Sequence, residues 1–469
     1  MTRLPLSVTV LTLAMLVAAC QPTGMEPPAA FPGPPLPTGA ETGPSVTVPE
    51  LEARRSALME ALPDALVLLP AEPSAKTMEQ PGWIQHPSFF YFTGLLEGTN
   101  AVLLVDAPRS ESVLFVGPVP SAFGAPASDV ALPADASLAG RTGVDRVLPW
   151  DEFVPYVTQR LTAGATLHLD AARRPVPSGS PPGMPPLTDA ANIWRHAVET
   201  AFPGAEIHSA ADAIAALRWK KSPHEQEQIR RNAIYSARAL MAGMRAVRAG
   251  LPERHAEAAV VAACLEAGAN GPSFWPWMQS GPNAHFGRLA NSFHVYDNLN
   301  RTMQAGELLR ADVGCMAGGY GGDVGRTVPV SGRFEGEQAF IWDRLVEAYH
   351  TGIHAMADGV PLDAVRAAST GYLEEAITSG RFTTPTEGDI LRAMASDINW
   401  HIHSIGVESA EPNTDVLVDG TVIAYEPMFV WGDHAYYLED MILVTGARAD
   451  VLTAHVPATA AEMAAFLNP

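Results

Sequence analysis

Two aspartates in a glycine-rich stretch have the residue type and the spacing to bind metal. Asp312 ends an apolar run, and Asp323 follows a cluster of glycines and precedes a second apolar run. This pattern predicts a β-hairpin. With a two-residue turn at Ala317-Gly318, antiparallel pairing sets Asp312 directly opposite Asp323, with Cβ atoms about 5 Å apart. Two facing carboxylates inside a sheet repel each other unless a cation, or a pair of cations, lies between them.

Two other interpretations of this stretch are open at this point. Asp and Gly concentrate in solvated turns, and a turn would leave both side chains in water. A phosphate-binding glycine loop is disfavoured, because no Lys follows the glycines and two acids would repel phosphate. The rest of the chain has to decide between a turn and a metal site.

Three later segments carry the other groups that a metal site needs. His401 and His403 alternate along an apolar strand, which places both imidazoles on one face. Glu426 follows an apolar run, and Glu439 begins another predicted strand. Alone, each would be an ordinary core or turn residue. Together with the two aspartates they give four carboxylates in or beside apolar strands, and burying that much negative charge without a metal is prohibitive.

The ordered set of these residues resembles the dinuclear site of the pita-bread metallopeptidases, which include aminopeptidase P, prolidase and methionine aminopeptidase. Residues 321–332, Gly-Gly-Asp-Val-Gly-Arg-Thr-Val-Pro-Val-Ser-Gly, are similar to that family's run Ser-Asp-Ile-Thr-Arg-Thr-Phe-Pro-Val-Ser-Gly. The resemblance implies two divalent ions, Mn²⁺ first, with Zn²⁺ or Co²⁺ as alternatives. It implies the metal ligands Asp312, Asp323, His403, Glu426 and Glu439, with Asp323 and Glu439 bridging both ions.

The same resemblance implies the catalytic groups. A pair of ions lowers the pKa of a bound water toward about 7, so that hydroxide attacks the scissile carbonyl. Glu426 corresponds to the proton shuttle, because a carboxylate beside the water can pass a proton to the leaving nitrogen. His294 matches a histidine that contacts the substrate carbonyl; it has the alternative of an ordinary surface or core residue, and His285 is then the substitute.

The chain departs from the family pattern at three positions. Ile402 stands where the family commonly has Gly before the ligand histidine. Ala410 takes the place of a second histidine that stabilises the tetrahedral intermediate, and Tyr437 takes the place of an Arg two residues before the final Glu. We expect His401, which shares a face with His403, to compensate for the missing histidine.

The elements that position these residues belong to a predicted α+β domain, residues 218–469. A capping box formed by Ser222 and Glu225, with Pro223 in the first turn, begins a helix that runs to about Arg248. Helices over 252–267, 335–358 and 362–379 are separated by strand-rich segments, so helices and antiparallel strands are segregated. The resemblance implies the pita-bread fold for this domain.

Residues 50–217 predict a smaller α/β domain, creatinase-like by resemblance. A helical pattern over 51–62 is followed by apolar strands at 65–69, 101–105, 112–116 and 166–170. The aromatic run from His86 to Gly94 predicts a core strand. That run also resembles the Phe/Tyr-Tyr-Leu-Thr-Gly segment in the amino-terminal domain of aminopeptidase P and prolidase.

The amino terminus predicts export. Residues 1–20 have a charged start, a short apolar core and small residues before Cys20, which is typical of a secretory signal. The Val-Ala-Ala-Cys ending resembles a bacterial lipobox, in which Cys20 is acylated; an ordinary signal peptide is the alternative. Residues 21–49 are rich in Pro, Gly and Thr and form a predicted tether. We therefore expect a lipid-anchored protein of the bacterial cell envelope, on the periplasmic side of the outer membrane if the source is Gram-negative.

Composition limits the partners. The formal net charge of -21 argues against nucleic acid or an anionic membrane surface as a partner, so we expect membrane contact only through the lipid anchor. Apart from Cys20, only Cys264 and Cys315 are present, which allows one disulfide in an oxidising compartment. Cys315 would face away from Asp312 and is interpreted as a packing residue. Relatives often form dimers or tetramers, which implies a homo-oligomer.

These observations predict a metal-dependent exopeptidase that acts on small peptides. By resemblance it removes an N-terminal residue preceding proline or cleaves Xaa-Pro dipeptides, because methionine aminopeptidases usually lack the amino-terminal domain. Two alternatives stay open: a creatinase-like hydrolase of C–N bonds, a group that works without metal, and a catalytically silent peptide-binding lipoprotein with the same fold.

Overall fold

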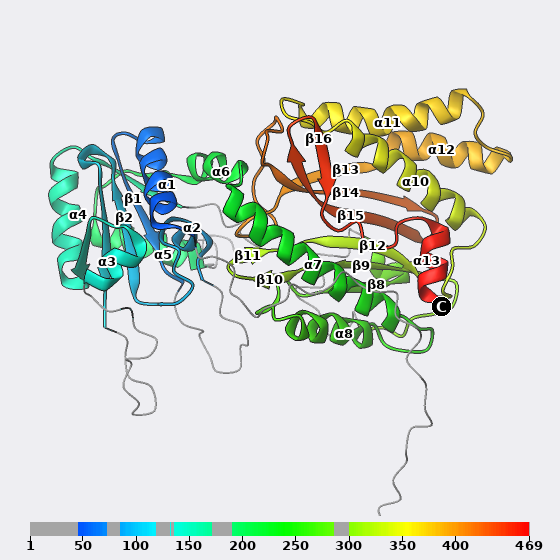
Figure 1. Ribbon diagram of the computed structural model, residues 1–469, viewed down its shortest axis with the longest axis horizontal. Helices are drawn as coiled ribbons and strands as arrows, with labels where there is room; N and C mark the ends of the chain where they lie inside the picture. Colours follow the sequence, from blue (N-terminus) through cyan, green and yellow to red (C-terminus); the bar gives the residue numbers. More distant parts are fainter. Residues whose placement is uncertain are drawn as a thin grey trace, which may run out of the picture.

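The computed structural model describes residues 46–72, 85–118, 132, 136–170, 190–285 and 300–468. The predicted signal segment with Cys20, most of the tether, and His294 lie outside these ranges. Within them the chain forms two domains that lie side by side (Figure 1). No helix among the described residues combines the length and the apolar character needed to cross a bilayer.

The amino-terminal domain is built on a 6-stranded sheet with strand order β4-β3-β2-β1-β5-β6. β1 pairs antiparallel with β2 and parallel with β5, so the sheet is mixed and helices flank it. The predicted α/β character is confirmed. The elements are α1 (Val48–Ala61), β1 (Ala65–Pro70), α2 (Pro87–Thr93), β2 (Ala101–Asp106), η1 (Ala107–Arg109), β3 (Glu111–Val116), α3 (Ala136–Thr142), β4 (Arg146–Pro149), η3 (Trp150–Glu152), α4 (Phe153–Thr162), β5 (Thr166–Leu169), α5 (Ala190–Ala201), β6 (Ile207–Ser209) and α6 (Ala211–Trp219).

The aromatic run predicted as a strand is wrong in its secondary structure, because Pro87–Thr93 is the helix α2. Pro87 stands in the first turn, where its fixed φ suits a helix, and Gly94 ends the helix in the left-handed conformation with φ 70°. Every residue of α2 is buried, so its sequence lacks the polar face that would have revealed a helical period. The prediction that the run belongs to the core holds.

The carboxy-terminal domain is built on a 7-stranded antiparallel sheet with order β13-β14-β15-β12-β9-β8, and β16 pairs with β15 off this path. The predicted α+β class is confirmed. The elements are α7 (Pro223–Ala246), α8 (Glu253–Glu266), β7 (Gly271–Pro272), β8 (Trp277–Ser280), η4 (Gly281–Ala284), β9 (Leu308–Val313), β10 (Cys315–Ala317), β11 (Tyr320–Gly321), β12 (Val324–Pro329), α10 (Glu337–His354), α11 (Leu362–Thr378), α12 (Pro385–Asp397), β13 (Asn399–Ser404), β14 (Val422–Trp431), β15 (His434–Thr445), β16 (Arg448–Val451) and α13 (Ala460–Leu467).

Two groups of helices cover this sheet. Figure 1 shows α7 and α8 beside β8 and β9, and α10, α11 and α12 beside β13, β14 and β15. The predicted capping box at Ser222 and Glu225 is present at the start of α7. Helices α12 and α13 were not predicted, although capping boxes also begin them, at Thr384 and at Thr459. The helices bury one face of the sheet and leave its other face for the site.

One hydrophobic cluster joins the two domains. It includes Phe89 and Phe90 of α2 together with Ile229 and Ala233 of α7. Burial of these side chains fixes the small domain against the first helix of the large one. The predicted boundary between residues 217 and 218 lies near the end of α6, and it stays a prediction.

Candidate metal centre

The hairpin that carries the two aspartates has a different register from the predicted one. Asp312 lies opposite Gly325, and Met316 lies opposite Gly321, so the turn is Gly318-Gly319. The prediction of a turn at Ala317-Gly318, with Asp312 directly opposite Asp323, is therefore wrong. Gly318 and Gly319 have φ of 58° and 83°, and a two-residue turn with positive φ at both positions strongly favours glycine over alanine.

The corrected register still keeps the acids on one face of the sheet. Asp323 is diagonal to Asp312 across the hairpin, because it precedes Gly325 by two residues. Gly325 also lies opposite Glu439 of β15. Asp312, Gly325 and Glu439 therefore form one row across three neighbouring strands, with a glycine in the middle.

Strands β13 and β14 bring the remaining groups. His401 lies opposite Glu426, and His403 lies opposite Ala424, so both imidazoles share a face with Glu426. The Nε2 atom of His403 is 3.3 Å from Glu426 Oε1, 3.7 Å from Asp323 Oδ2 and 3.7 Å from Glu439 Oε1. Ligand atoms of Asp323, His403 and Glu439 all lie within 4.8 Å of one another. His403 is thus surrounded by carboxylates from β14, from β15 and from the residue that precedes β12.

Burial and mutual repulsion perturb these carboxyl groups. Burial is the main cause that raises the pKa of Asp312 to about 7, against the opposing effect of Arg310. Burial and the neighbouring acids raise the pKa of Asp323 and that of Glu439 well above the ordinary range. Burial alone would raise the pKa of Glu426 too, but hydrogen bonds from His401 and His403 outweigh it and lower that pKa.

The donor set fits divalent metal. Oδ1 of Asp323 and Oε1 of Glu439 are buried and accept no hydrogen bond from any described residue. Buried carboxylate oxygens without a donor cost free energy, and a cation would satisfy them. Carboxylates together with one imidazole suit Mn²⁺, Zn²⁺ and similar ions. Nδ1 of His403 lies 3.1 Å from the Ser404 carbonyl, which orients Nε2 toward the acids.

Two residues of this face were missed as members of the site. The hydroxyl of Tyr437 lies 2.9 Å from Glu426 Oε2 and 2.7 Å from Glu439 Oε2. Arg310, buried two residues before Asp312 on β9, donates to Gln279 Oε1 at 2.5 Å. Their positions in the sequence could have revealed both residues. A residue two positions before a ligand on the same strand shares the ligand's face, as Arg310 does with Asp312 and Tyr437 with Glu439.

The other predicted site residues have separate positions. Nδ1 of His401 contacts Glu426 Oε1, and the His401 side chain is 40% exposed, so it lies between the acids and solvent. His285, the substitute for His294, has Nε2 3.2 Å from the Asp433 carbonyl. Cys264 and Cys315 form a disulfide, which answers the question that the sequence left open.

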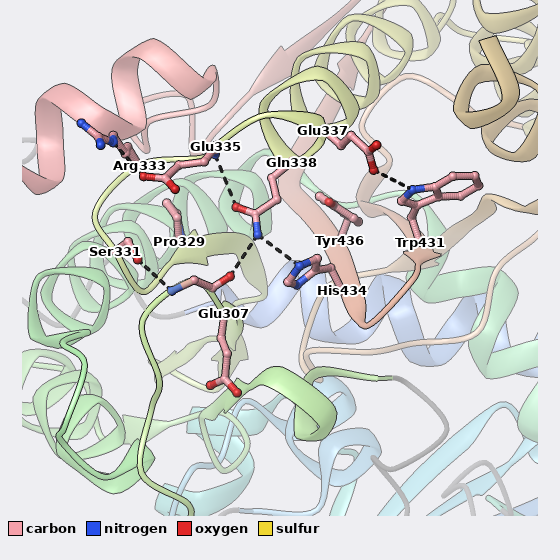
Figure 2. A pocket seen from close by; sticks show the side chains of 11 residues that line it. Glu307, Pro329, Ser331, Arg333, Glu335, Glu337, Gln338, Trp431, His434 and Tyr436 are labelled. Carbon is pink, nitrogen blue, oxygen red and sulfur yellow. Dashed lines mark hydrogen bonds and ion pairs between the residues drawn. The ribbon is translucent and has the colours of Figure 1, made fainter. Parts of the chain in front are cut away.

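A pocket of about 310 Å³ lies away from these acids, at the tip of the hairpin between β14 and β15. Figure 2 shows Gln338 in contact with His434, and Trp431 in contact with Glu337. Tyr436 lines this pocket, whereas Tyr437, the next residue of β15, points to the acids. The two tyrosines therefore mark the opposite faces of one strand.

The chain matches two family profiles. Residues 227–446 match metallopeptidase family M24, and residues 51–168 match the aminopeptidase P N-terminal domain. The first covers all five predicted ligand positions.

Whole-chain relatives agree with these profiles. A Xaa-Pro aminopeptidase of Escherichia coli is 26% identical over 462 residues, which cover 89% of this chain and 97% of the relative. The structure of aminopeptidase P from E. coli with the inhibitor Pro-Leu is similar with a TM-score of 0.70 and 24% identity, covering 90% of this chain and 98% of that one. Zinc-substituted E. coli aminopeptidase P in complex with product gives a TM-score of 0.69 at 25% identity, with the same coverage.

Proposed function

We propose that this chain, a metallo-aminopeptidase that belongs to the pita-bread aminopeptidase P family, removes the N-terminal residue that precedes proline or cleaves Xaa-Pro dipeptides. The observation that carries the proposal is the cluster of four buried carboxylates, three of them within 3.7 Å of His403 Nε2, in which two oxygens accept no hydrogen bond from a described residue. The Xaa-Pro specificity is supported by the E. coli relative, which aligns over nearly its whole length.

The five predicted ligands would hold two divalent ions. Asp323 and Glu439 would bind both ions, Asp312 would bind one of them, and His403 would bind the other together with Glu426. When bound, such ions acidify a water and polarise the scissile carbonyl. We propose Mn²⁺ as the native metal, with Zn²⁺ or Co²⁺ as alternatives.

The chain's own residues would move the proton. Glu426 is suited to take a proton from the attacking water and to give it to the leaving nitrogen, because the two histidines keep its carboxylate ionised. His401 contacts the same carboxylate and is 40% exposed, so it offers a path from Glu426 to solvent. This contact supports the proposal that His401 acts in place of the histidine that Ala410 replaces. His294 stays the proposed contact for the substrate carbonyl.

The test is metal analysis of the purified mature protein, followed by hydrolysis of an Xaa-Pro-Xaa tripeptide and of an Xaa-Pro dipeptide. We expect about two divalent ions per chain and hydrolysis that is lost with a chelator and restored by Mn²⁺. A matched tripeptide with Ala in place of Pro is the control for specificity. Stoichiometric metal without hydrolysis would support the silent peptide-binding protein, and metal-free activity on a C–N substrate such as creatine would support the creatinase-like hydrolase.

Location is a separate proposal. We propose an envelope protein anchored through acylated Cys20, and the Cys264–Cys315 disulfide supports an oxidising compartment. Cys20→Ser is expected to move the protein from the membrane fraction to the soluble fraction. An unchanged distribution would contradict the anchor.

A further inference from the structure

The phenol of Tyr437 stands among ligands from separate strands. Its side chain is buried, and its hydroxyl lies within hydrogen-bond distance of Glu426 on β14 and of Glu439 on β15. A hydroxyl has one proton to donate, so the two carboxylate oxygens share that proton. Both contacts require the ring to stay between the two side chains.

Gly325 provides that place. A Cβ atom at residue 325 would lie 2.1 Å from Cε1 and 2.8 Å from Cδ1 of Tyr437, and 2.9 Å from the Ala311 carbonyl oxygen, so the ring occupies most of the space that a side chain would need. Gly325 lies directly opposite both Asp312 and Glu439. The ring thus fills the gap in the middle of the ligand row.

The two positions differ from the family together. In the similar run Ser-Asp-Ile-Thr-Arg-Thr, the residue two positions after the aspartate is Thr, and here it is Gly325. The Arg expected two residues before the final Glu is Tyr437. The loss of a side chain at one position and the gain of an aromatic ring at the other are physically linked, because the two side chains would compete for the same volume.

A buried cation lies near the tyrosine. The guanidinium carbon of Arg310 is 5.9 Å from the centroid of the Tyr437 ring and 5.7 Å from that of Trp277. Thr327 of β12 lies between β9 and β15. It pairs with Arg310 of β9, and its Oγ1 accepts a hydrogen bond from the backbone amide of Tyr437 of β15 at 2.7 Å. Arg310 thus places a buried positive charge near the neutral side chain of Tyr437.

From these observations, and resting on the proposed metallopeptidase function, we propose that Tyr437 is a positioning residue of the metal centre. Its hydroxyl fixes Glu426 relative to Glu439, and Gly325 is the matched residue that admits its ring. Tyr437 acts through the ligands and does not touch the substrate.

The test compares Mn²⁺ binding by isothermal titration calorimetry for the mature protein, Tyr437→Phe and the control Tyr436→Phe. The control removes the same hydroxyl from the neighbouring residue, on the opposite face of β15 (Figure 2). We expect Tyr437→Phe to weaken Mn²⁺ binding by about 10- to 100-fold, as loss of a hydrogen bond to a metal ligand does, and the control to bind as the parent does. At saturating Mn²⁺ we expect kcat to fall while KM stays unchanged.

The Gly325→Ala variant tests the pairing. Its Cβ would displace the ring, so we expect weaker Mn²⁺ binding, and the double variant with Tyr437→Phe should bind no more weakly than the weaker single variant. Additive losses would overturn the role of Gly325. Unchanged affinity in Tyr437→Phe, with a parent protein that binds Mn²⁺, would overturn the positioning role even if Gly325→Ala fails to fold. A parent that binds no divalent ion would instead contradict the proposed function.

Discussion

Two groups of buried charges meet on strand β13 and behave in opposite ways. On one side of the strand end, Nζ of Lys221 lies 2.6 Å from Ser404 Oγ and 3.2 Å from Glu411 Oε2. Arg218 adds a second cation, 2.9 Å from Glu408 and 3.9 Å from Glu411. On the other side, His403 lies within 3.7 Å of three buried carboxylates, and the nearby buried cation among the described residues is Arg310.

The pKa shifts follow the charge balance of each cluster. Burial works against ionisation of Glu411, but Lys221 and Arg218 outweigh it and lower the pKa of Glu411. Burial and neighbouring acids instead raise the pKa of Asp323 and of Glu439. Burial is similar in the two clusters, but the charges differ. Glu411 is paired with buried cations, whereas the acids around His403 lack enough positive charge to balance them. The second arrangement is the one expected of a cation site.

The largest expected effect comes from removing one carboxylate of the metal cluster. Asp323→Asn keeps the shape of the side chain but removes its charge, and we expect kcat/KM to fall by about 10³-fold or more, because the proposed ligand is lost. Exposed Asp433→Asn is the control and should keep the parent's activity. If Asp323→Asn retains both metal and activity, the cluster is not the catalytic site.

The same kind of substitution in the cluster of Lys221, Arg218 and Glu411 should affect the stability of the fold instead of catalysis. Glu411→Gln removes the negative charge that pairs with the buried cations Lys221 and Arg218. We therefore expect a loss of about 4 kcal/mol in the free energy of unfolding. Urea denaturation with bound Mn²⁺ measures this, while metal affinity should not change. A double variant, Lys221→Met with Glu411→Met, should recover part of the loss. A stable Glu411→Gln would show that this network contributes little.

The pH dependence of the metal-free protein separates the two clusters by sign. The pKa of Asp312 is raised to about 7, so between about pH 4 and pH 7 the folded protein holds a proton that the unfolded chain has released. Stability should therefore fall as pH rises through this window, by on the order of 3 kcal/mol. The lowered pKa of Glu411 acts oppositely, since its stabilisation is present above about pH 4.5 and is lost on acidification.

Urea denaturation from pH 4 to pH 8 in a chelator measures this slope. Added Mn²⁺ should reduce the decline toward neutral pH, because the metal takes the place of the protons. A metal-free protein that gains stability from pH 5 to pH 7 would contradict the view of the cluster as short of positive charge.

The convergence of the acids could be predicted from two signals, the ordered resemblance that proposes the ligand set and the local strand pattern that assigns their faces. Each proposed ligand is a charged or imidazole residue in or directly beside an apolar strand, and the period of two assigns its face. The error in the hairpin register changed the partner of Asp312 by two residues, from Asp323 to Gly325. A shift of two keeps every side chain on its face, so the acids still converged.

What could not be predicted depends on contacts across several strands. The row that joins Arg310, Thr327 and Tyr437 requires the pairing of β9, β12 and β15, which no single segment encodes. The match between Gly325 and the Tyr437 ring is likewise a three-dimensional packing fact. In the small domain, α2 was mistaken for a strand because a helix buried all round shows no polar period.

The smallest expected effect is at the border between the acid cluster and solvent. His401→Ala removes the contact to Glu426 without removing a proposed metal ligand, so metal content should stay at the parent's value. We expect kcat/KM to fall about tenfold, because Glu426 keeps its own proton-transfer role and loses only its path to solvent. The control is His434→Ala, in the outer pocket. Unchanged catalytic efficiency in His401→Ala would rule out compensation for Ala410, and lost metal would instead make His401 part of the binding set.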